Sequence, residues 1–223
     1  MNLFDINYIF FKLPGYNVSA VEFIGTLTGL LCVMYAAKEK VISWPFGIVN
    51  AVFFFILFYQ ARLYPDMLLQ IYYLATSVYG WWRWTHPRDE SETDYKDELK
   101  VSRIGIYGIA LILTATVAAS AAAGAGVARV HLWLPAVFPE PAAFPYADSF
   151  VALLSITAQV LLSLKKNEAW ILWIIVDAVA AVIYMMKGIY LVSGEYVVFG
   201  LIASAGLWNW SRIFNDYIAE AAE

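Results

Sequence analysis

A carboxylate surrounded by aromatic rings is the feature of this sequence with the clearest chemistry. Asp177 lies in the middle of an apolar segment, with Trp173 at i−4, Trp170 at i−7 and Tyr184 at i+7. On a helix these four side chains share one face. An aspartate at membrane depth costs about 2.5–3.5 kcal/mol on insertion scales, so such residues usually have a function. Charge pairing and cation–π contact would suit a cationic or electron-poor ring. The alternative is an aspartate paired with a neighbouring helix.

Amide side chains form a second group of candidates. Asn50 is central in its segment, Gln70 shares a helical face with Tyr73, and Gln159 lies in a later segment. An amide offers a donor and an acceptor together, which suits a ligand with a carboxamide and ribose hydroxyls. The complete predicted substrate-binding set is Asn50, Gln70, Tyr73, Gln159, Trp173, Asp177 and Tyr184.

Other polar and aromatic residues near these candidates have simpler explanations. Ser77 and Ser155 are typical of helix–helix contacts. Asp66 and Asp148 lie near predicted helix ends, where a charge is easily accommodated. A cluster of tryptophans at the ends of two segments is typical of a membrane-interface belt; its members are Trp81, Trp82, Trp84, Trp208 and Trp210.

The composition indicates a membrane as the solvent of this chain. Of its 223 residues, 62% are hydrophobic and 14% are charged, and the mean hydropathy is +0.66. A soluble domain is about 25% charged. The first ten residues have no basic region before the apolar stretch, so we expect the first hydrophobic helix to direct insertion. The single cysteine, Cys32, excludes an intrachain disulfide.

Seven segments are long and apolar enough to predict spanning helices, since a span needs about 20 mostly apolar residues. The charged stretch 85–101 and the proline-rich stretch 127–145 separate some of them. We therefore predict an all-α integral membrane protein with seven transmembrane helices at 18–37, 44–60, 66–84, 102–125, 146–164, 170–187 and 195–212.

An internal repeat organises these segments. Trp44, Trp82 and Trp84 each recur 126 residues later without a gap, as Trp170, Trp208 and Trp210. The same offset pairs Lys40 with Lys166, Ile48 with Ile174, Tyr64 with Tyr190 and Gly80 with Gly206. Internal repeats in membrane proteins usually indicate a transporter that binds its substrate between the halves.

The repeat predicts a 3+1+3 arrangement. Two three-helix repeats, 18–84 and 146–212, flank a linker helix at 102–125. The odd helix restores the chain direction, so the repeats should be parallel, related by an axis along the membrane normal. The linker is rich in alanine and glycine, and small residues allow close packing against one repeat.

Basic residues predict the orientation. Four cations lie on the side of the N-terminus: Lys12, Arg62, Arg129 and Lys187. The other side carries the remaining ten of the 14. Because cytoplasmic loops carry the excess of lysine and arginine, we expect the N-terminus outside and the C-terminus in the cytoplasm.

Several chemistries are excluded by what the sequence lacks. His86 and His131 lie in loops, which excludes an intramembrane bis-histidine haem. The sequence has no nucleotide-binding G-x-x-x-x-G-K-[ST] motif, no lysine in the middle of the last helix, no Cys/His metal spacing and no nucleophile beside a base. We therefore expect no enzyme activity, no cofactor, no metal and no nucleic-acid partner.

Two runs resemble the signature of PnuC-type vitamin transporters. They are WPFGIVNAVFFFILFYQARLYPDMLLQIYYLATSVYGWWRW at 44–84 and WILWIIVDAVAAVIYMMKGIYLVSGEYVVFGLIASAGLWNW at 170–210. The matching pieces are the WPxGxxN start, the LYxD…Q segment, the YGWWxW end, the WxxWxxxD helix and the closing GxWxW, and they span both repeats.

The resemblance implies a SWEET-like fold and facilitated uptake of nicotinamide riboside across a bacterial inner membrane. It further implies trapping by a cytoplasmic kinase, and a homotrimer. Carried onto this chain, it places Asn50, Gln70, Tyr73, Trp173, Asp177 and Tyr184 in the pocket; Gln159 is added from depth and periodicity alone. Thiamine, another cationic ring, would use much the same residues and remains an alternative. A ligand-binding receptor without flux is a further alternative, although two similar halves favour alternating access.

Overall fold

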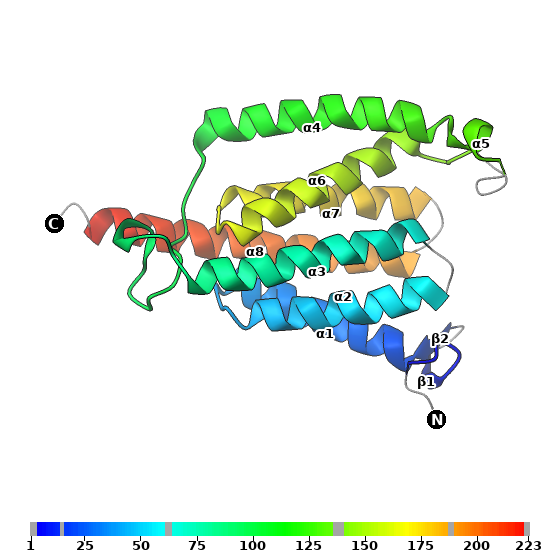
Figure 1. The fold of residues 1–223 in the computed structure, drawn as a ribbon, viewed down its shortest axis with the longest axis horizontal. Helices are drawn as coiled ribbons and strands as arrows, with labels where there is room; N and C mark the ends of the chain where they lie inside the picture. The colour runs from blue at the N-terminus through cyan, green and yellow to red at the C-terminus, as the bar shows by residue number, and fades with distance from the viewer. Residues whose placement is uncertain (1–3, 14–15, 61–63, 136–140, 187–189, 221–223) are drawn as a thin grey trace. The chain divides into compact units, whose positions relative to one another are not determined.

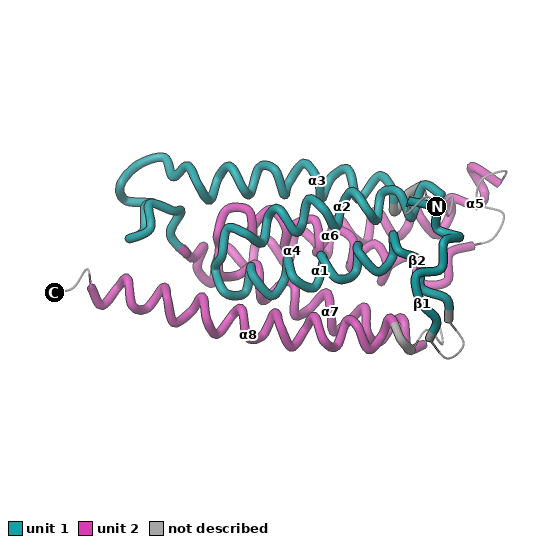
Figure 2. Tube along the Cα trace, turned by 90° about the horizontal axis from the view of Figure 1, so that it is seen from below, with its two compact units in different colours: residues 1–100 teal, residues 101–223 magenta. Residues whose placement is uncertain are grey.

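The computed structural model describes residues 4–13, 16–60, 64–135, 141–186 and 190–220, with the side chains of 13, 16, 64–66, 190 and 191 left out. The chain divides into two compact units, Met1–Lys100 and Val101–Glu223 (Figure 2). Each unit is described by itself.

The first unit contains a β-hairpin followed by three long helices (Figure 1). Strands β1 (Ile9–Leu13) and β2 (Tyr16–Ser19) pair antiparallel and lead into α1 (Ala20–Ala37), α2 (Ser43–Gln60) and α3 (Tyr64–Thr85). Helix α2 packs against both α1 and α3. Ser19 caps α1 by accepting a hydrogen bond from the Glu22 amide (3.1 Å), an S-x-x-E capping arrangement. The hairpin was not predicted from the sequence.

The second unit contains the remaining helices. They are α4 (Gly105–Val127), the short α5 (Val130–Trp133), α6 (Pro145–Ser163), α7 (Glu168–Met186) and α8 (Tyr190–Glu220). Helix α7 packs against both α6 and α8, as α2 does between its neighbours in the first unit, and α4 packs on α6. Gly124 of α4 meets Tyr146 of α6 so closely that an added Cβ would lie 2.5 Å from the ring.

The long helices lie where the sequence predicted spans, with two differences. Among the described residues, six helices are long and apolar enough to cross a membrane; α3 is the least apolar long helix and falls outside that set. Helix α8 continues to Glu220, eight residues beyond the predicted end at 212. The Arg103 guanidinium lies over the Phe214 ring of this extension, 4.5 Å from its centroid, a cation–π contact.

Both units contain the same turn between their first two repeat helices. Glu39 and Lys165, which the 126-residue offset pairs, are buried and adopt positive φ angles of 58° and 53°. The amide of the next residue, Lys40 or Lys166, bonds to a carbonyl five residues back at 3.0 or 2.9 Å. This is a Schellman helix end, in which glycine usually takes the positive-φ position.

The repeated tryptophans form the same buried contact in each unit. Trp44 of α2 meets Trp84 of α3 edge to face, with centroids 5.2 Å apart and an interplanar angle of 89°. Trp170 of α7 meets Trp210 of α8 in the same way, at 5.5 Å and 89°. All four side chains are buried. Gly80 and Gly206 leave the space that the Trp44 and Trp170 rings fill.

The interface-belt interpretation therefore holds for only some of the tryptophans at these helix ends. Trp81, Trp82 and Trp208 are exposed, as a belt requires. Trp84 and Trp210 are fully buried, so for these two the interpretation was wrong. The physical reason is that a glycine one turn earlier admits the partner ring.

The charged stretch after α3 folds back onto the end of that helix. The buried Arg83 guanidinium forms an ion pair with Glu92 of the short 3₁₀ helix η1 (Glu90–Glu92). The Leu99 amide donates to the Trp84 carbonyl (2.8 Å) and closes the loop over the tryptophan pair. The hydrogen bond from Arg83 holds the pKa of the Glu92 carboxyl below its usual range, with a further contribution from the Arg88 amide.

In the second unit, the turn between α6 and α7 holds the start of α4. Glu168 accepts hydrogen bonds from the amides of Ile104 (3.1 Å) and Gly105 (3.3 Å), which places a carboxylate at the N-terminus of α4. Ser102 exchanges backbone hydrogen bonds with the same turn, donating to Lys165 (3.1 Å) and accepting from Asn167 (2.9 Å). The predicted linker helix thus belongs to the compact unit that contains α6–α8.

Candidate substrate site

Asp177 is the most distinctive polar residue of the second unit. It lies in the middle of α7, and its side chain is 5% exposed. Helix α8 comes close at this level: a Cβ added to Gly200 would lie 3.5 Å from the Asp177 Cβ, an ordinary van der Waals contact. No described residue donates a hydrogen bond to this carboxylate. The alternative interpretation, in which Asp177 pairs with a neighbouring helix, therefore has no hydrogen-bond donor to support it among the described residues.

The aromatic residues predicted to share the Asp177 face have different environments. Trp173 is half-buried, one helical turn before Asp177. Tyr184 stacks on Tyr196 of α8, with centroids 5.4 Å apart and an interplanar angle of 13°. Trp170 packs edge to face against Trp210 and belongs to the contact between α7 and α8. Of the three rings, Trp170 therefore belongs to the helix packing, whereas Trp173 stays a predicted substrate contact and Tyr184 is part of an aromatic pair with Tyr196.

Tyr196 is a candidate that the sequence reasoning missed. Its ring lies against Tyr184, and the 126-residue offset aligns it with Gln70. Since Gln70 was already a candidate, applying the repeat offset to the site residues as well as to the tryptophans would have identified Tyr196.

Helix α6 contributes a buried amide to the second unit. Gln159 is 9% exposed and lies on the helix that packs against α7. Ser155, one turn earlier, donates to the Val151 carbonyl of its own helix (2.8 Å), which agrees with a structural role. Asp148 lies in the first turn of α6, as expected of a charge at a helix N-terminus.

Three candidates lie in the first unit. Asn50 of α2 donates through its side-chain nitrogen to the Gly25 carbonyl of α1 (2.8 Å), so it joins two helices. On α3, Gln70 is buried and Tyr73 is half-buried, its ring 5.6 Å from that of Tyr72. Asp66 belongs to α3, but its side chain lies outside the described residues.

The two units thus divide the predicted set. One holds Asn50, Gln70 and Tyr73; the other holds Gln159, Trp173, Asp177 and Tyr184. Among the described residues, no three His, Cys, Asp or Glu side chains gather as metal ligands. What the set offers a ligand is a carboxylate, aromatic rings and amides.

The long apolar helices indicate a polytopic helical membrane protein. The repeated helix-packing motif and the buried carboxylate in the middle of a span indicate the transporter class. The comparisons with known proteins identify the family. Residues 19–212 match the sequence model described as nicotinamide mononucleotide transporter, and the chain belongs to that family.

Relatives with assigned functions support the same placement. The chain is 34% identical to the nicotinamide riboside transporter PnuC of Escherichia coli (strain K12), with 94% of each chain covered. It is 24% identical to the riboflavin/roseoflavin transporter RibM of Streptomyces davaonensis, with 90% of this chain and 88% of that one covered. These relatives are transporters rather than enzymes, which confirms the expectation that this chain is not an enzyme.

The fold is also similar to a solved structure. The crystal structure of the vitamin B3 transporter PnuC aligns with a TM-score of 0.63 at 23% identity, covering 88% of this chain and 82% of that one. The resemblance to PnuC-type transporters inferred from the sequence motifs is confirmed.

Proposed function

We propose that this protein transports nicotinamide riboside across a bacterial inner membrane by facilitated diffusion. The observation that carries the proposal is the buried Asp177 carboxylate, to which no described residue donates a hydrogen bond, on a helix that also presents Trp173. A buried carboxylate needs a partner. The pyridinium ring of nicotinamide riboside is a cation with an aromatic face, and it would supply both the charge and the stacking surface.

The charge on the cargo separates the candidate vitamins. The family includes a relative named for riboflavin and roseoflavin, and the riboflavin ring system is neutral. A carboxylate would give a neutral ring no charge pairing, so Asp177 favours nicotinamide riboside or thiamine over riboflavin. The relation to nicotinamide riboside transporters favours the former of the two cations.

For the mechanism we propose alternating access between two parallel three-helix repeats, 18–84 and 146–212, joined by the helix at 102–125. The matching Schellman turns and tryptophan pairs of the two units support the repeat. Asn50, Gln70, Tyr73, Gln159, Trp173, Asp177 and Tyr184 would all contribute to substrate binding. We further propose a homotrimer with the N-terminus outside and the C-terminus in the cytoplasm, where a kinase would trap the product of passive entry.

The experiment is thermal denaturation of the purified protein with a vitamin panel, because a ligand that binds the folded state raises its melting temperature. Nicotinamide riboside should give the largest rise, thiamine a smaller one and riboflavin none. Uncharged nicotinamide is the control for the pyridine ring without the ribose and the fixed charge. A larger rise with riboflavin than with nicotinamide riboside would contradict the assignment of the cargo.

A further inference from the structure

The N-terminal hairpin exposes aromatic side chains next to the start of a membrane span. Phe10 is 53% exposed and Phe11 is 36% exposed, yet both rings contact Phe23 of α1. Phe10 stacks on it at 5.2 Å, and Phe11 meets it edge to face at 5.5 Å. Three aromatic rings therefore form one cluster that remains partly open on its outer side.

A β-bulge makes this cluster possible. Successive side chains of a regular strand point to opposite faces, so neighbouring phenylalanines would normally separate. The register of β1 against β2 shifts between Ile9 and Phe11. A bulge re-aims a side chain, and here it allows Phe10 and Phe11 to reach the same ring of α1. Because of the bulge, the hairpin places both phenylalanine side chains beside the start of α1.

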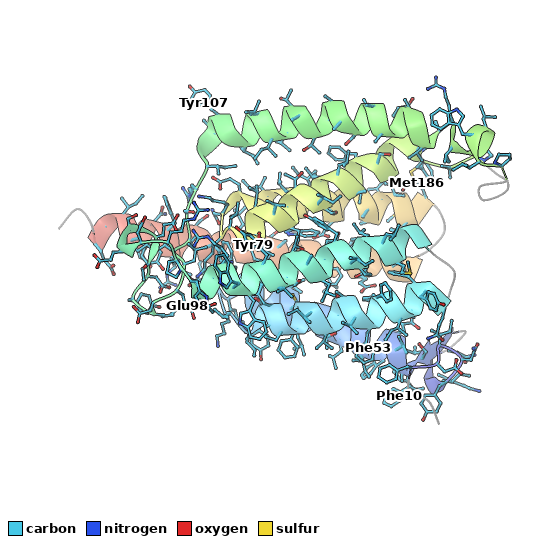
Figure 3. The ribbon with its side chains drawn as sticks, viewed as in Figure 1. Phe10, Phe53, Tyr79, Glu98, Tyr107 and Met186 are labelled. Atoms are coloured by element: carbon cyan, nitrogen blue, oxygen red, sulfur yellow. The ribbon has the colours of Figure 1, made fainter. Side chains whose placement is uncertain are left out.

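The hairpin is fixed at the ends of two apolar helices. Strand β2 ends at Ser19, which caps α1. Gln60, the last residue of α2, accepts a hydrogen bond from the Ile6 amide (3.2 Å) and donates to the Phe4 carbonyl (2.6 Å). Phe4 also stacks on Phe53 of α2 at 5.9 Å. Figure 3 labels Phe10 on the hairpin and Phe53 on the adjoining helix. At the ends of membrane-spanning helices, the hydrocarbon of a bilayer gives way to headgroups.

We propose that the hairpin, together with the segment that precedes it, is an interfacial lipid anchor, whose exposed apolar side chains lie at the boundary between headgroups and acyl chains. These side chains are Phe4, Ile9, Phe10 and Phe11. The occupant is lipid because the hairpin adjoins the ends of α1 and α2, which are both apolar enough to span a membrane and which carry exposed apolar side chains such as Leu27 and Tyr59. Lys12, exposed on the same strand, adds a positive charge that suits phosphate headgroups.

The test uses spin labels on the full-length protein in liposomes of phosphatidylcholine and phosphatidylglycerol. With Cys32 replaced by alanine, a nitroxide is attached through a cysteine at Phe10, and separately at Phe4. Leu27 of α1 serves as the control inside the span, and Tyr95, which is 81% exposed in the charged loop, serves as the control in water. Collision with oxygen, which concentrates in lipid, is compared with collision with a water-soluble nickel chelate.

The labels at Phe10 and Phe4 should give positive depth parameters, between those of the Leu27 and Tyr95 labels. The proposal would be overturned if the labels at Phe10 and at Phe4 collided with the nickel chelate as often as the label at Tyr95 does. Protection from both oxygen and nickel would also overturn it, because that result would mean that protein, such as a second copy of the chain, covers the hairpin. The two labelled sites lie on different segments, so the loss of one variant leaves the other to decide.

Discussion

Replacing Gly206 by alanine tests whether the tryptophan pair of the second unit is a fixed packing element. A Cβ at this position would lie 2.8 Å from the Trp170 ring. The ring cannot retreat easily, because it is 1% exposed and held edge to face against Trp210. Overpacking of this kind costs about 1–3 kcal/mol. Alanine also stabilises a helix by about 1 kcal/mol relative to glycine. This gain opposes the cost of the clash, so a control variant must account for it.

Gly194→Ala provides the matched control on the same helix. It is the same substitution within α8, and no described atom lies within 4 Å of the added Cβ. The difference between the two variants therefore isolates the clash of about 1–3 kcal/mol. For a chain of this length, each kcal/mol shifts the melting temperature by about 2–4 °C. The Gly206→Ala protein should melt roughly 2–12 °C below the Gly194→Ala protein in the same detergent.

The assay is thermal unfolding followed by tryptophan fluorescence, with size-exclusion chromatography to confirm that each variant begins folded. Gly80→Ala should behave like Gly206→Ala, since Gly80 lies against the Trp44 ring. Equal melting temperatures for Gly206→Ala and Gly194→Ala would refute the reasoning, because the Trp170 ring would then be free to move.

Two further predictions concern the site and the loop after α3. Trp173→Ala should weaken substrate binding by roughly 1–2 kcal/mol through lost stacking, or about ten-fold in the dissociation constant measured by calorimetry. Asp177→Asn should lower the affinity for substrate while the protein still folds. If both variants and Asn50→Ala bind substrate like the wild type, the pocket lies elsewhere. The hydrogen bond from Arg83 lowers the pKa of Glu92 below the 4.5 of a free glutamate, so its contribution to stability is present above pH 4.5 and is lost as the pH falls through the lowered pKa. The Leu99 amide, which closes this loop, should therefore lose hydrogen-exchange protection in acid, and Glu92→Gln should remove that pH dependence; a loop that loosens equally in both proteins would contradict it.

The helices of this protein were predictable because each depends on a local pattern. Long apolar runs located all seven long helices, and the recurrence of Trp44, Trp84, Trp170 and Trp210 indicated equivalent packing. The burial of Trp84 and Trp210 was not predicted, because their exposed neighbours Trp82 and Trp208 carry the same residue type. The spacing between Gly80 and Trp84, repeated at Gly206 and Trp210, was the available signal.

Features that depend on tertiary contacts were not predictable in the same way. The bulge in β1 removes the alternation by which a strand is recognised. Helix α8 extends past Arg212 to Glu220, and in this extension Phe214 contacts Arg103, which lies more than a hundred residues earlier. The Schellman turns carry Glu39 and Lys165 where glycine is usual, so they lack the expected residue.

Within the site, residue types were informative but contacts were not. Depth and periodicity identified Asp177, which is buried. The same reasoning could not foresee that the Asn50 amide binds the Gly25 carbonyl, or that Tyr184 stacks on Tyr196. Each of these partners comes from another helix, and helical periodicity within one segment carries no information about it.

The most direct test of the central proposal is uptake of labelled nicotinamide riboside into proteoliposomes that contain only this protein. Passive transport predicts that the internal concentration rises to the external one and stops there, with or without an imposed proton or sodium gradient. Addition of ATP and a nicotinamide riboside kinase inside the vesicles should then permit accumulation of the phosphorylated product. Uphill accumulation driven by either gradient would contradict passive transport, and binding without entry would contradict transport itself.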